Sequence, residues 1–168
     1  AARPPREHNV TDLFWEPGTL AGVRISVIDN FVSGDECDAI VARARPHMQA
    51  ATHAGDNGEL NHKSKARDSQ QAVVGPRKKV RDDVAARVQA RSAALANVLS
   101  GYNLTSEGQE ELMAIQYLEG QQYHLHCDGS CDGSPFLEGG RLATVLMYCE
   151  VADRGGATSF PNAGVHVR

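Results

Sequence analysis

The chain has 168 residues, of which 41% are hydrophobic and 23% are charged, a composition typical of one folded globular domain. Its formal net charge of −4 argues against a general nucleic-acid-binding protein, which would need a basic face. No apolar run approaches the roughly 20 residues needed to cross a bilayer, so we expect no membrane span within the chain. Four cysteines are too few for a disulfide scaffold and leave open whether one bridge forms or none.

The first half of the chain predicts one strand and one helix. Residues 1–20 contain three prolines and are expected to form an irregular lead-in. Apolar and polar residues then alternate over residues 23–28, which predicts a half-buried strand. Ser33 followed by Glu36 forms a capping-box pattern, and we expect the helix that it starts to falter near Pro46.

A long polar segment separates this helix from a second one. Residues 53–79 are nearly devoid of large apolar side chains until their C-terminal part, and a loop of this length inside a domain is typical of a mobile lid or a binding loop. Apolar residues from Val80 to Leu99 then keep helical spacing, which predicts an amphipathic helix of roughly 18–20 residues.

The C-terminal third is expected to consist of short strands separated by glycines. The predicted strands are residues 112–118, 122–126, 142–150, 157–160 and 164–167. Helices followed by several strands indicate an α+β domain in which the helices support one large antiparallel sheet.

His126 and Asp128 are the residues best placed to carry chemistry. Residues two apart in a strand point to the same face, so an imidazole and a carboxylate could reach one ion. With a second His, such a pair forms the facial triad of non-haem Fe(II) oxygenases. A His-x-Asp alone also describes many surface histidines beside turn aspartates, and His124 on the same face could be a further ligand or a solvent-exposed residue.

Three longer motifs surround this pair in a fixed order. The chain reads Tyr-x-x-Gly-x-x-Tyr-x-x-His-x-Asp from Tyr117, Arg-x-x-Thr-x-Leu-x-Tyr from Arg141, and Gly-Gly-x-Thr-x-Phe-Pro from Gly155. Together with an Asp29-Asn30-Phe31-Val32-Ser33 opening and an Arg67-Asp68-Ser69 element, they resemble the prolyl 4-hydroxylase family of Fe(II)/2-oxoglutarate-dependent dioxygenases, in its plant and algal form.

The resemblance implies a fold and a set of site residues. The fold would be a double-stranded β-helix, or jelly roll, supported by the N-terminal helices. Iron would be bound by His126 and Asp128, 2-oxoglutarate by Tyr117 and Thr144, and the peptide by Tyr123 and Arg67. For Tyr117, Thr144 and Tyr148, packing in the core is the competing interpretation.

The same resemblance implies the reaction. A procollagen-proline 4-dioxygenase of this type hydroxylates prolyl residues with O₂ and 2-oxoglutarate, releases succinate and CO₂, and uses ascorbate. A proline-rich peptide or protein in polyproline II form is the expected substrate, because its preset conformation costs little entropy to bind. Segment 53–79 would be the lid over it. The motif spacing favours the secretory pathway over the cytoplasm.

The family pattern also requires a second, distal His and a basic residue that anchors 2-oxoglutarate. The only His after Asp128 is His166, no Lys follows, and by its register His166 is not expected to be the distal ligand. We therefore expect residues 1–168 to be a single catalytic domain lacking its last strands, which further residues or a second polypeptide would supply.

Other functions remain open at this level. A peptide-binding relative that has lost its metal would share most of these motifs, and so would a 2-oxoglutarate oxygenase with a non-proline substrate. A cupin-like site at His124 and His126 lacks the Glu expected soon after it. A structural zinc site at Cys127 and Cys131 lacks a second cysteine pair.

Overall fold

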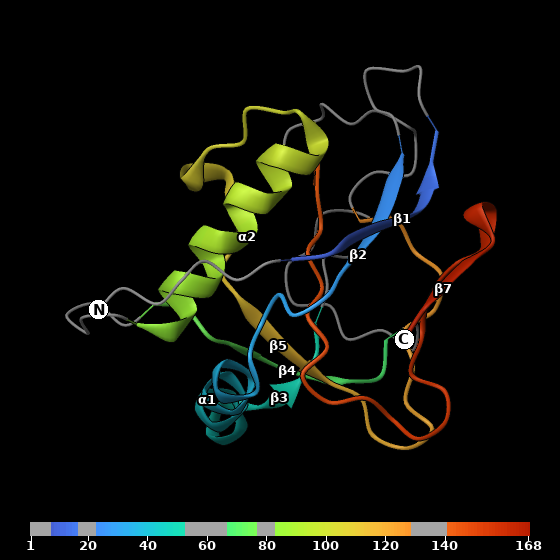
Figure 1. Ribbon diagram of the computed structural model, residues 1–168. Helices are drawn as coiled ribbons and strands as arrows, with labels where there is room; N and C mark the ends of the chain where they lie inside the picture. Colours follow the sequence, from blue (N-terminus) through green and yellow to red (C-terminus); the bar gives the residue numbers. More distant parts are fainter. Residues whose placement is uncertain (1–7, 17–22, 53–66, 77–82, 129–140) are drawn as a thin grey trace.

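The structure is a computed structural model that describes residues 8–16, 23–52, 67–76, 83–128 and 141–168. These residues form an α+β arrangement of helices and short antiparallel sheets (Figure 1), as the sequence predicts. The elements are β1 (Val10–Trp15), β2 (Arg24–Ile28), α1 (Gly34–Ala44), β3 (Gln49–Ala50), β4 (Gln70–Val73), α2 (Val84–Ser100), β5 (Met113–Gln116), β6 (Thr158–Phe160) and β7 (Val165–Val167).

An antiparallel hairpin opens the described chain. Strand β2 confirms the alternation seen in the sequence, and β1 pairs with it, with Val10 opposite Ile28. The prediction of an irregular lead-in is therefore wrong for residues 10–15, where β-branched and aromatic side chains favour a strand. Arg24 donates two hydrogen bonds to Asp12, at 2.8 and 2.9 Å, and fixes the two strands side by side.

Helix α1 begins and ends where the sequence predicts. Ser33 accepts a hydrogen bond from the backbone N–H of Glu36, and the Glu36 carboxylate accepts one from the backbone N–H of Ser33, which completes the capping box. A short 3₁₀ turn with Pro46 in its first turn follows the helix. The inner face of α1 buries Cys37, Ile40 and Ala44.

Helix α2 crosses α1 (Figure 1) and is joined to it by two ion pairs. Asp83 caps α2 and accepts from Arg43 of α1 at 2.7 Å, while Glu36 of α1 accepts from Arg91 of α2 at 2.9 Å. Each acidic residue at the start of one helix thus binds an arginine of the other. The predicted helical spacing is confirmed from residue 84 onwards, and residues 77–82 lie outside the described part.

A three-stranded antiparallel sheet, in the order β3-β4-β5, packs against this helix pair. Val74 and Val88 are fully buried and form a core cluster with Ile40, Ala44 and Ala72. Strand β4 lies inside the polar segment 53–79, so the prediction of a loop is wrong at residues 70–73. Pairing with β5 and burial of Ala72 stabilise this short strand, while residues 53–66 and 77–79 lie outside the described part.

The C-terminal third departs most from the predicted sheet. Strands β6 and β7 confirm the strands predicted at residues 157–160 and 164–167, and they pair antiparallel as a hairpin. Residues 142–150, predicted as a strand, have no ladder partner among the described residues, although exposure alternates with a period of two over residues 144–150. Residues 122–126, also predicted as a strand, form only one isolated antiparallel bridge, between Arg67 and Tyr123. The described part therefore contains three small sheets, and the jelly roll is not seen in it.

A disulfide joins Cys37 of α1 to Cys149, with 5.2 Å between the Cα atoms and 112 residues between them in sequence. It attaches the unpaired segment 141–150 to the helical layer. Cys127 is disulfide-bonded as well and cannot be a thiolate ligand, which removes the structural zinc site. In the described ranges, no helix has the length and apolarity that crossing a membrane would require.

Candidate metal-binding site

His126 and Asp128 lie close enough to share one ion. The Nε2 atom of His126 is 3.3 Å from Oδ1 of Asp128, and each side chain is somewhat more than a third exposed. Two ligands about 2.1 Å from a metal and at right angles to each other stand about 3 Å apart. The pair therefore has the separation expected of two neighbouring ligands in a facial triad.

The hydrogen bond made by Nδ1 of His126 leaves Nε2 as the ring nitrogen that could bind a metal. Its Nδ1 is 2.9 Å from the backbone carbonyl oxygen of His124, and a carbonyl can only accept a hydrogen bond. A neutral ring that donates from Nδ1 presents the lone pair of Nε2 towards Asp128. Both ring nitrogens thus face acceptors, an arrangement satisfied either by a protonated ring or by a cation between Nε2 and the carboxylate.

Asp128 is held by two residues of the segment that follows. Thr144 donates from Oγ1 to Oδ2 of Asp128 at 2.7 Å, and a guanidinium nitrogen of Arg141 lies 3.8 Å from Oδ1. Arg141 in turn donates two hydrogen bonds to Glu110, at 2.6 and 3.0 Å. These hydrogen bonds lower the pKa of Glu110 and raise that of Arg141. The positive charge beside Asp128 is therefore maintained at all ordinary pH values.

Aromatic packing holds the imidazole from its face. The rings of Tyr123 and His126 stack with 3.7 Å between their centroids and 15° between their planes. The guanidinium carbon of Arg67 lies 5.0 Å from the centroid of the Tyr123 ring. Arg67 also donates to the buried Ser69, at 3.1 Å.

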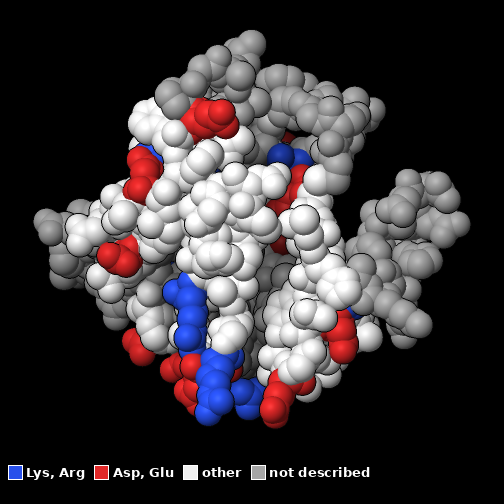
Figure 2. Space-filling model, turned by 90° about the vertical axis from the view of Figure 1, so that its right-hand side faces the viewer, with Lys and Arg blue, Asp and Glu red and all other residues white. Residues whose placement is uncertain are grey.

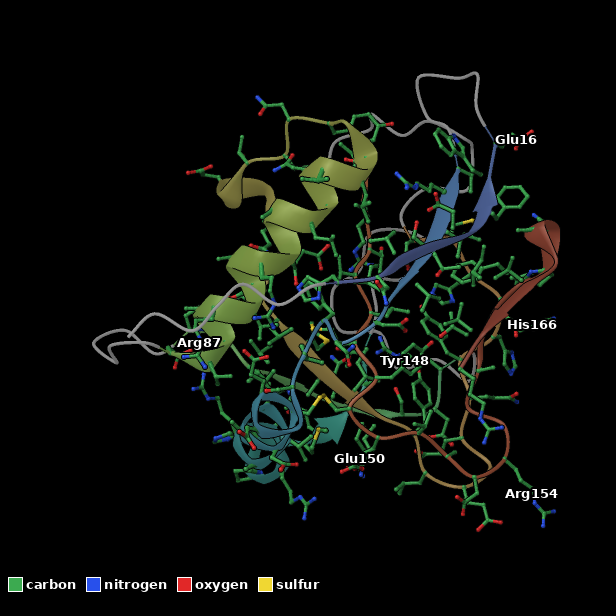
Figure 3. The ribbon with its side chains drawn as sticks, in the orientation of Figure 1. Glu16, Arg87, Tyr148, Glu150, Arg154 and His166 are labelled. Carbon is green, nitrogen blue, oxygen red and sulfur yellow. A yellow bond between two sulfur atoms is a disulfide. The ribbon has the colours of Figure 1, made fainter. Side chains whose placement is uncertain are left out.

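The structure thus brings together five of the residues singled out in the sequence, namely Arg67, Tyr123, His126, Asp128 and Thr144. Tyr117 follows β5 with 43% of its surface exposed, and no contact with the pair is seen. His166 lies in β7, where its Nδ1 is 2.9 Å from Oγ of Ser159. Figure 3 shows His166 on β7 near the edge of the molecule and Tyr148 nearer to the middle.

Within the described ranges, no third His, Cys, Asp or Glu joins the pair to complete a set of metal ligands. The two donor atoms fit two positions of an iron site in distance and in tautomer. The distal His and the basic anchor for 2-oxoglutarate stay unassigned.

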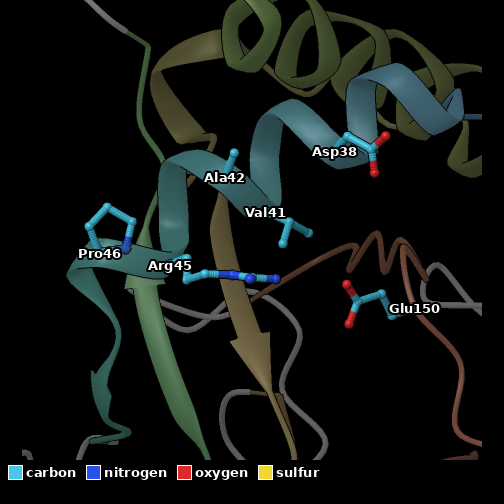
Figure 4. A pocket seen from close by; sticks show the side chains of 6 residues that line it. All are labelled: Asp38, Val41, Ala42, Arg45, Pro46 and Glu150. Carbon is cyan, nitrogen blue, oxygen red and sulfur yellow. The ribbon is translucent and has the colours of Figure 1, made fainter.

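A shallow groove of about 530 Å³ lies elsewhere, between α1 and the residue after the disulfide (Figure 4). Its lining consists of Asp38, Val41, Ala42, Arg45, Pro46 and Glu150. It contains no histidine, and none of its residues contacts the His126–Asp128 pair. The pair, and not this groove, is therefore the candidate site.

Arg141 and Glu110 are the site residues that sequence reasoning missed. Arg141 is the first residue of the motif that contains Thr144, so the motif included it without indicating what it contacts. Glu110 lies outside every motif, and its partner is 31 residues away in sequence, so no local signal could have identified it.

Many large apolar side chains around the site are exposed. The ones between residues 113 and 148 are Met113, Ile115, Tyr117, Leu118, Leu125, Leu142, Leu146 and Tyr148, each more than a third exposed. Figure 2 shows a face on which many charged side chains gather at the lower edge, while the middle is largely uncharged. Where such side chains are contiguous, the apolar surface marks a site of contact with another molecule or segment.

Comparison with known proteins identifies relatives over most of the chain. No protein-family model matches the sequence. The chain is 31% identical to "Probable prolyl 4-hydroxylase 7" of Arabidopsis thaliana over 90% of its length, and 30% identical to "Prolyl 4-hydroxylase 5" of the same plant over 94%. It is 32% identical to "Prolyl 4-hydroxylase 2" over 83%.

The aligned regions cover 44%, 49% and 44% of these three proteins, so the chain spans about half the length of the curated relatives that it matches. Further Arabidopsis thaliana proteins with prolyl 4-hydroxylase in their names are 27–33% identical to the chain. Over the part that it spans, the chain is a homologue of plant proteins named prolyl 4-hydroxylases.

Proposed function

We propose that this chain carries the metal-binding half of an Fe(II)/2-oxoglutarate-dependent dioxygenase that hydroxylates prolyl residues in a proline-rich peptide or protein. The observation that carries the proposal is the 3.3 Å separation of His126 Nε2 and Asp128 Oδ1, with Nδ1 held by a backbone carbonyl. The relatives named prolyl 4-hydroxylases support the choice of reaction and substrate.

In this proposal the two ligand side chains have separate supports. His126 binds the metal through Nε2, and the His124 carbonyl keeps the proton on Nδ1. Asp128 binds through Oδ1, while Thr144 holds Oδ2. With its co-substrates 2-oxoglutarate and O₂, and with ascorbate to keep it reduced, iron supplies the oxidation that adds one oxygen atom to the prolyl ring and yields succinate and CO₂.

The remaining site residues bind the organic partners. Thr144 and Tyr117 line the 2-oxoglutarate pocket, and Arg67 and Tyr123 contact the peptide. The positions of these residues support the assigned roles. Thr144, Arg67 and Tyr123 lie around His126 and Asp128, and Tyr117 is close to His126 in sequence. A third ligand and a carboxylate anchor complete the site from residues outside the described ranges or from a further polypeptide.

We also propose that the three small antiparallel sheets are parts of a double-stranded β-helix. The period-two exposure of residues 144–150 and the exposed apolar side chains near the site support this arrangement. Both are expected of strands whose partners are missing. The Cys37–Cys149 disulfide supports a setting in the secretory pathway, since such bridges persist in oxidising compartments.

The test measures metal binding and product separately. Mn(II) is titrated into the chain and into the variants His126→Ala and His166→Ala. A second assay supplies Fe(II), 2-oxoglutarate, ascorbate and a proline-rich peptide, and mass spectrometry detects one added oxygen atom. The proposal expects His126→Ala to abolish Mn(II) binding and His166→Ala to leave it unchanged.

Each result of this test has a clear meaning. Mn(II) binding that survives His126→Ala would rule out the proposed site. Hydroxylated peptide from the chain alone would place the third ligand within its 168 residues. A third measurement titrates the proline-rich peptide into the chain, and binding of the peptide without any Mn(II) binding would instead identify a peptide-binding relative that has lost its metal.

A further inference from the structure

The ring of Tyr123 covers one face of the metal-ligand candidate His126. The two rings are nearly parallel, at 15°, and their centroids are 3.7 Å apart. A histidine ring fixed only by the hydrogen bond from Nδ1 to the His124 carbonyl could still pivot about that bond. A flat surface against its face removes this freedom. The two restraints together direct Nε2 at Asp128.

Tyr123 is itself held by the strand segment that contains Arg67. The backbones of Arg67 and Tyr123 form an antiparallel bridge, and the N–H of Asp68 donates to the carbonyl of Gln122 at 2.9 Å. The side chain of Gln121 adds a hydrogen bond to Asp68 at 3.0 Å. Residues 121–123 are therefore fixed to residues 67–68 by both backbone and side-chain contacts.

The guanidinium of Arg67 strengthens this arrangement. Its carbon lies 5.0 Å from the centroid of the Tyr123 ring, within the range of a cation–π contact. Its Nε donates a hydrogen bond to Oγ of Ser69. Ser69 is only 5% exposed, so this bond anchors the guanidinium to a buried residue. Arg67, Tyr123 and His126 thus form a continuous stack that begins in the β4 region and ends at the ligand.

We propose that Tyr123 is a positioning residue that orients the imidazole of His126 for metal binding, and that Arg67 holds Tyr123 in place. This role rests on the proposed metal site and is additional to any contact with the peptide. It requires the flat ring of Tyr123 and not its hydroxyl, because stacking uses the face of the ring. Groups that support a metal-ligating histidine typically change metal affinity 10- to 100-fold when they are removed.

The experiment compares Tyr123→Phe, which keeps the ring, with Tyr123→Leu, which removes it. In the metal-free protein, the ring current of residue 123 displaces the carbon-bound proton resonances of His126 in the NMR spectrum, and His126→Gln identifies those resonances. We expect the displacement to persist in Tyr123→Phe, to vanish in Tyr123→Leu and to diminish in Arg67→Ala. Far-UV circular dichroism verifies that each variant is folded.

Mn(II) affinity provides the second measurement. Tyr123→Phe should bind as tightly as the unaltered chain, whereas Tyr123→Leu should bind about 10- to 100-fold more weakly. Unchanged His126 resonances in a folded Tyr123→Leu variant would overturn the positioning role, and so would equal Mn(II) affinities for the two variants. Loss of all Mn(II) binding in the unaltered chain would refute the proposed function, while the resonances would still decide whether Tyr123 orients the ring.

Discussion

The two carboxylate oxygens of Asp128 have different partners, and this division matters for any ion bound there. Oδ2 accepts the hydroxyl proton of Thr144, whereas Oδ1 faces His126 and Arg141. A carboxylate fixed through one oxygen presents the other in a defined direction. Thr144 therefore holds Asp128 through one oxygen, while the other oxygen faces His126 and Arg141.

Replacing Thr144 by valine should weaken metal binding without unfolding the chain. Thr144→Val keeps the shape of the side chain and removes the hydrogen bond to Asp128, so Mn(II) affinity should fall about 10-fold or more. Isothermal titration calorimetry measures the change. Thr105→Val, at an exposed residue away from the pair, is the matched control. Equal affinities for the two variants would contradict the role of Thr144.

The ion pair between Glu110 and Arg141 should respond to acid in a predictable direction. Hydrogen bonds from Arg141 lower the pKa of Glu110 below its ordinary value of 4.5. A lowered pKa in the folded state means that the contact stabilises the fold above pH 4.5 and that this contribution is lost as the pH falls through the lowered value. Arg141→Gln should bring the pKa of Glu110 back towards 4.5.

An NMR titration of the side-chain carboxylates measures this return. Asp12 supplies an internal control, because its pKa is lowered by hydrogen bonds from Arg24 and Ser26 and not by Arg141. The pKa of Asp12 should stay in place in the Arg141→Gln variant. A Glu110 pKa that does not move would mean that the ion pair is not formed in solution.

At the scale of elements, the two helices are joined by acidic residues that cap one helix and bind the other. Asp83 accepts hydrogen bonds from the N–H groups of Ala85 and Ala86 and also pairs with Arg43. Its side chain is only 2% exposed, so both functions occur away from water. Loss of the carboxylate leaves a half-buried arginine without this partner.

Asp83→Ala should therefore lower the free energy of unfolding by roughly 2–4 kcal/mol, which combines a lost helix cap with a broken buried ion pair. Asp83→Asn keeps a capping oxygen and should cost less. Urea denaturation followed by circular dichroism compares the two. If both variants lose the same free energy of unfolding, the capping hydrogen bonds contribute nothing beyond the charge of Asp83.

The disulfide between Cys37 and Cys149 should contribute strongly to stability because it closes a long loop. The double variant Cys37→Ala/Cys149→Ala should lose roughly 2–5 kcal/mol in the free energy of unfolding. Chemical denaturation under non-reducing conditions measures the loss and keeps the bridge at Cys127 intact. A single variant such as Cys149→Ala shows how much a remaining thiol at Cys37 alters the result.

Elements with local signals were predictable from the sequence, and elements that need distant partners were not. The capping box of Ser33 and Glu36 and the helical spacing after Val84 identify both helices, because every interaction involved lies within a few residues. The exposure of residues 144–150 alternates as that of a strand should, yet a strand exists only where a second backbone pairs with it.

The site shows the same division. The His-x-Asp spacing and the surrounding motifs identify His126, Asp128 and Thr144 as neighbours. The stack of Tyr123 on His126 and the pairing of Arg141 with Glu110 depend on how loops fold back, which no spacing encodes.

At the scale of the whole molecule, the exposed apolar side chains near the site should cause self-association. Leu125 is 80% exposed and Leu146 is 53% exposed, and several other large apolar residues between 113 and 148 are uncovered. Sedimentation velocity should show larger species as the protein concentration rises, because apolar surface is removed from water when copies meet.

The double variant Leu125→Lys/Leu146→Lys should reduce this association. Val98→Lys, on α2, changes an equally exposed apolar residue outside this region and should leave the association unchanged. A chain that stays monomeric at every concentration would show that these side chains are covered in solution.

The connectivity of the Cys37–Cys149 bridge also sets the order of events when the chain is made. Cys149 follows Cys37 by 112 residues, which is roughly 6–22 s of synthesis at typical ribosomal rates. Cys127 emerges earlier, so the thiol of Cys37 meets a wrong partner before the right one exists. Wherever Cys37 bonds to Cys127 first, thiol–disulfide exchange must correct the pairing after translation has passed residue 149. The segment that carries Thr144 is therefore attached to α1 only late in biogenesis. The yield of correctly folded protein should depend on a disulfide isomerase.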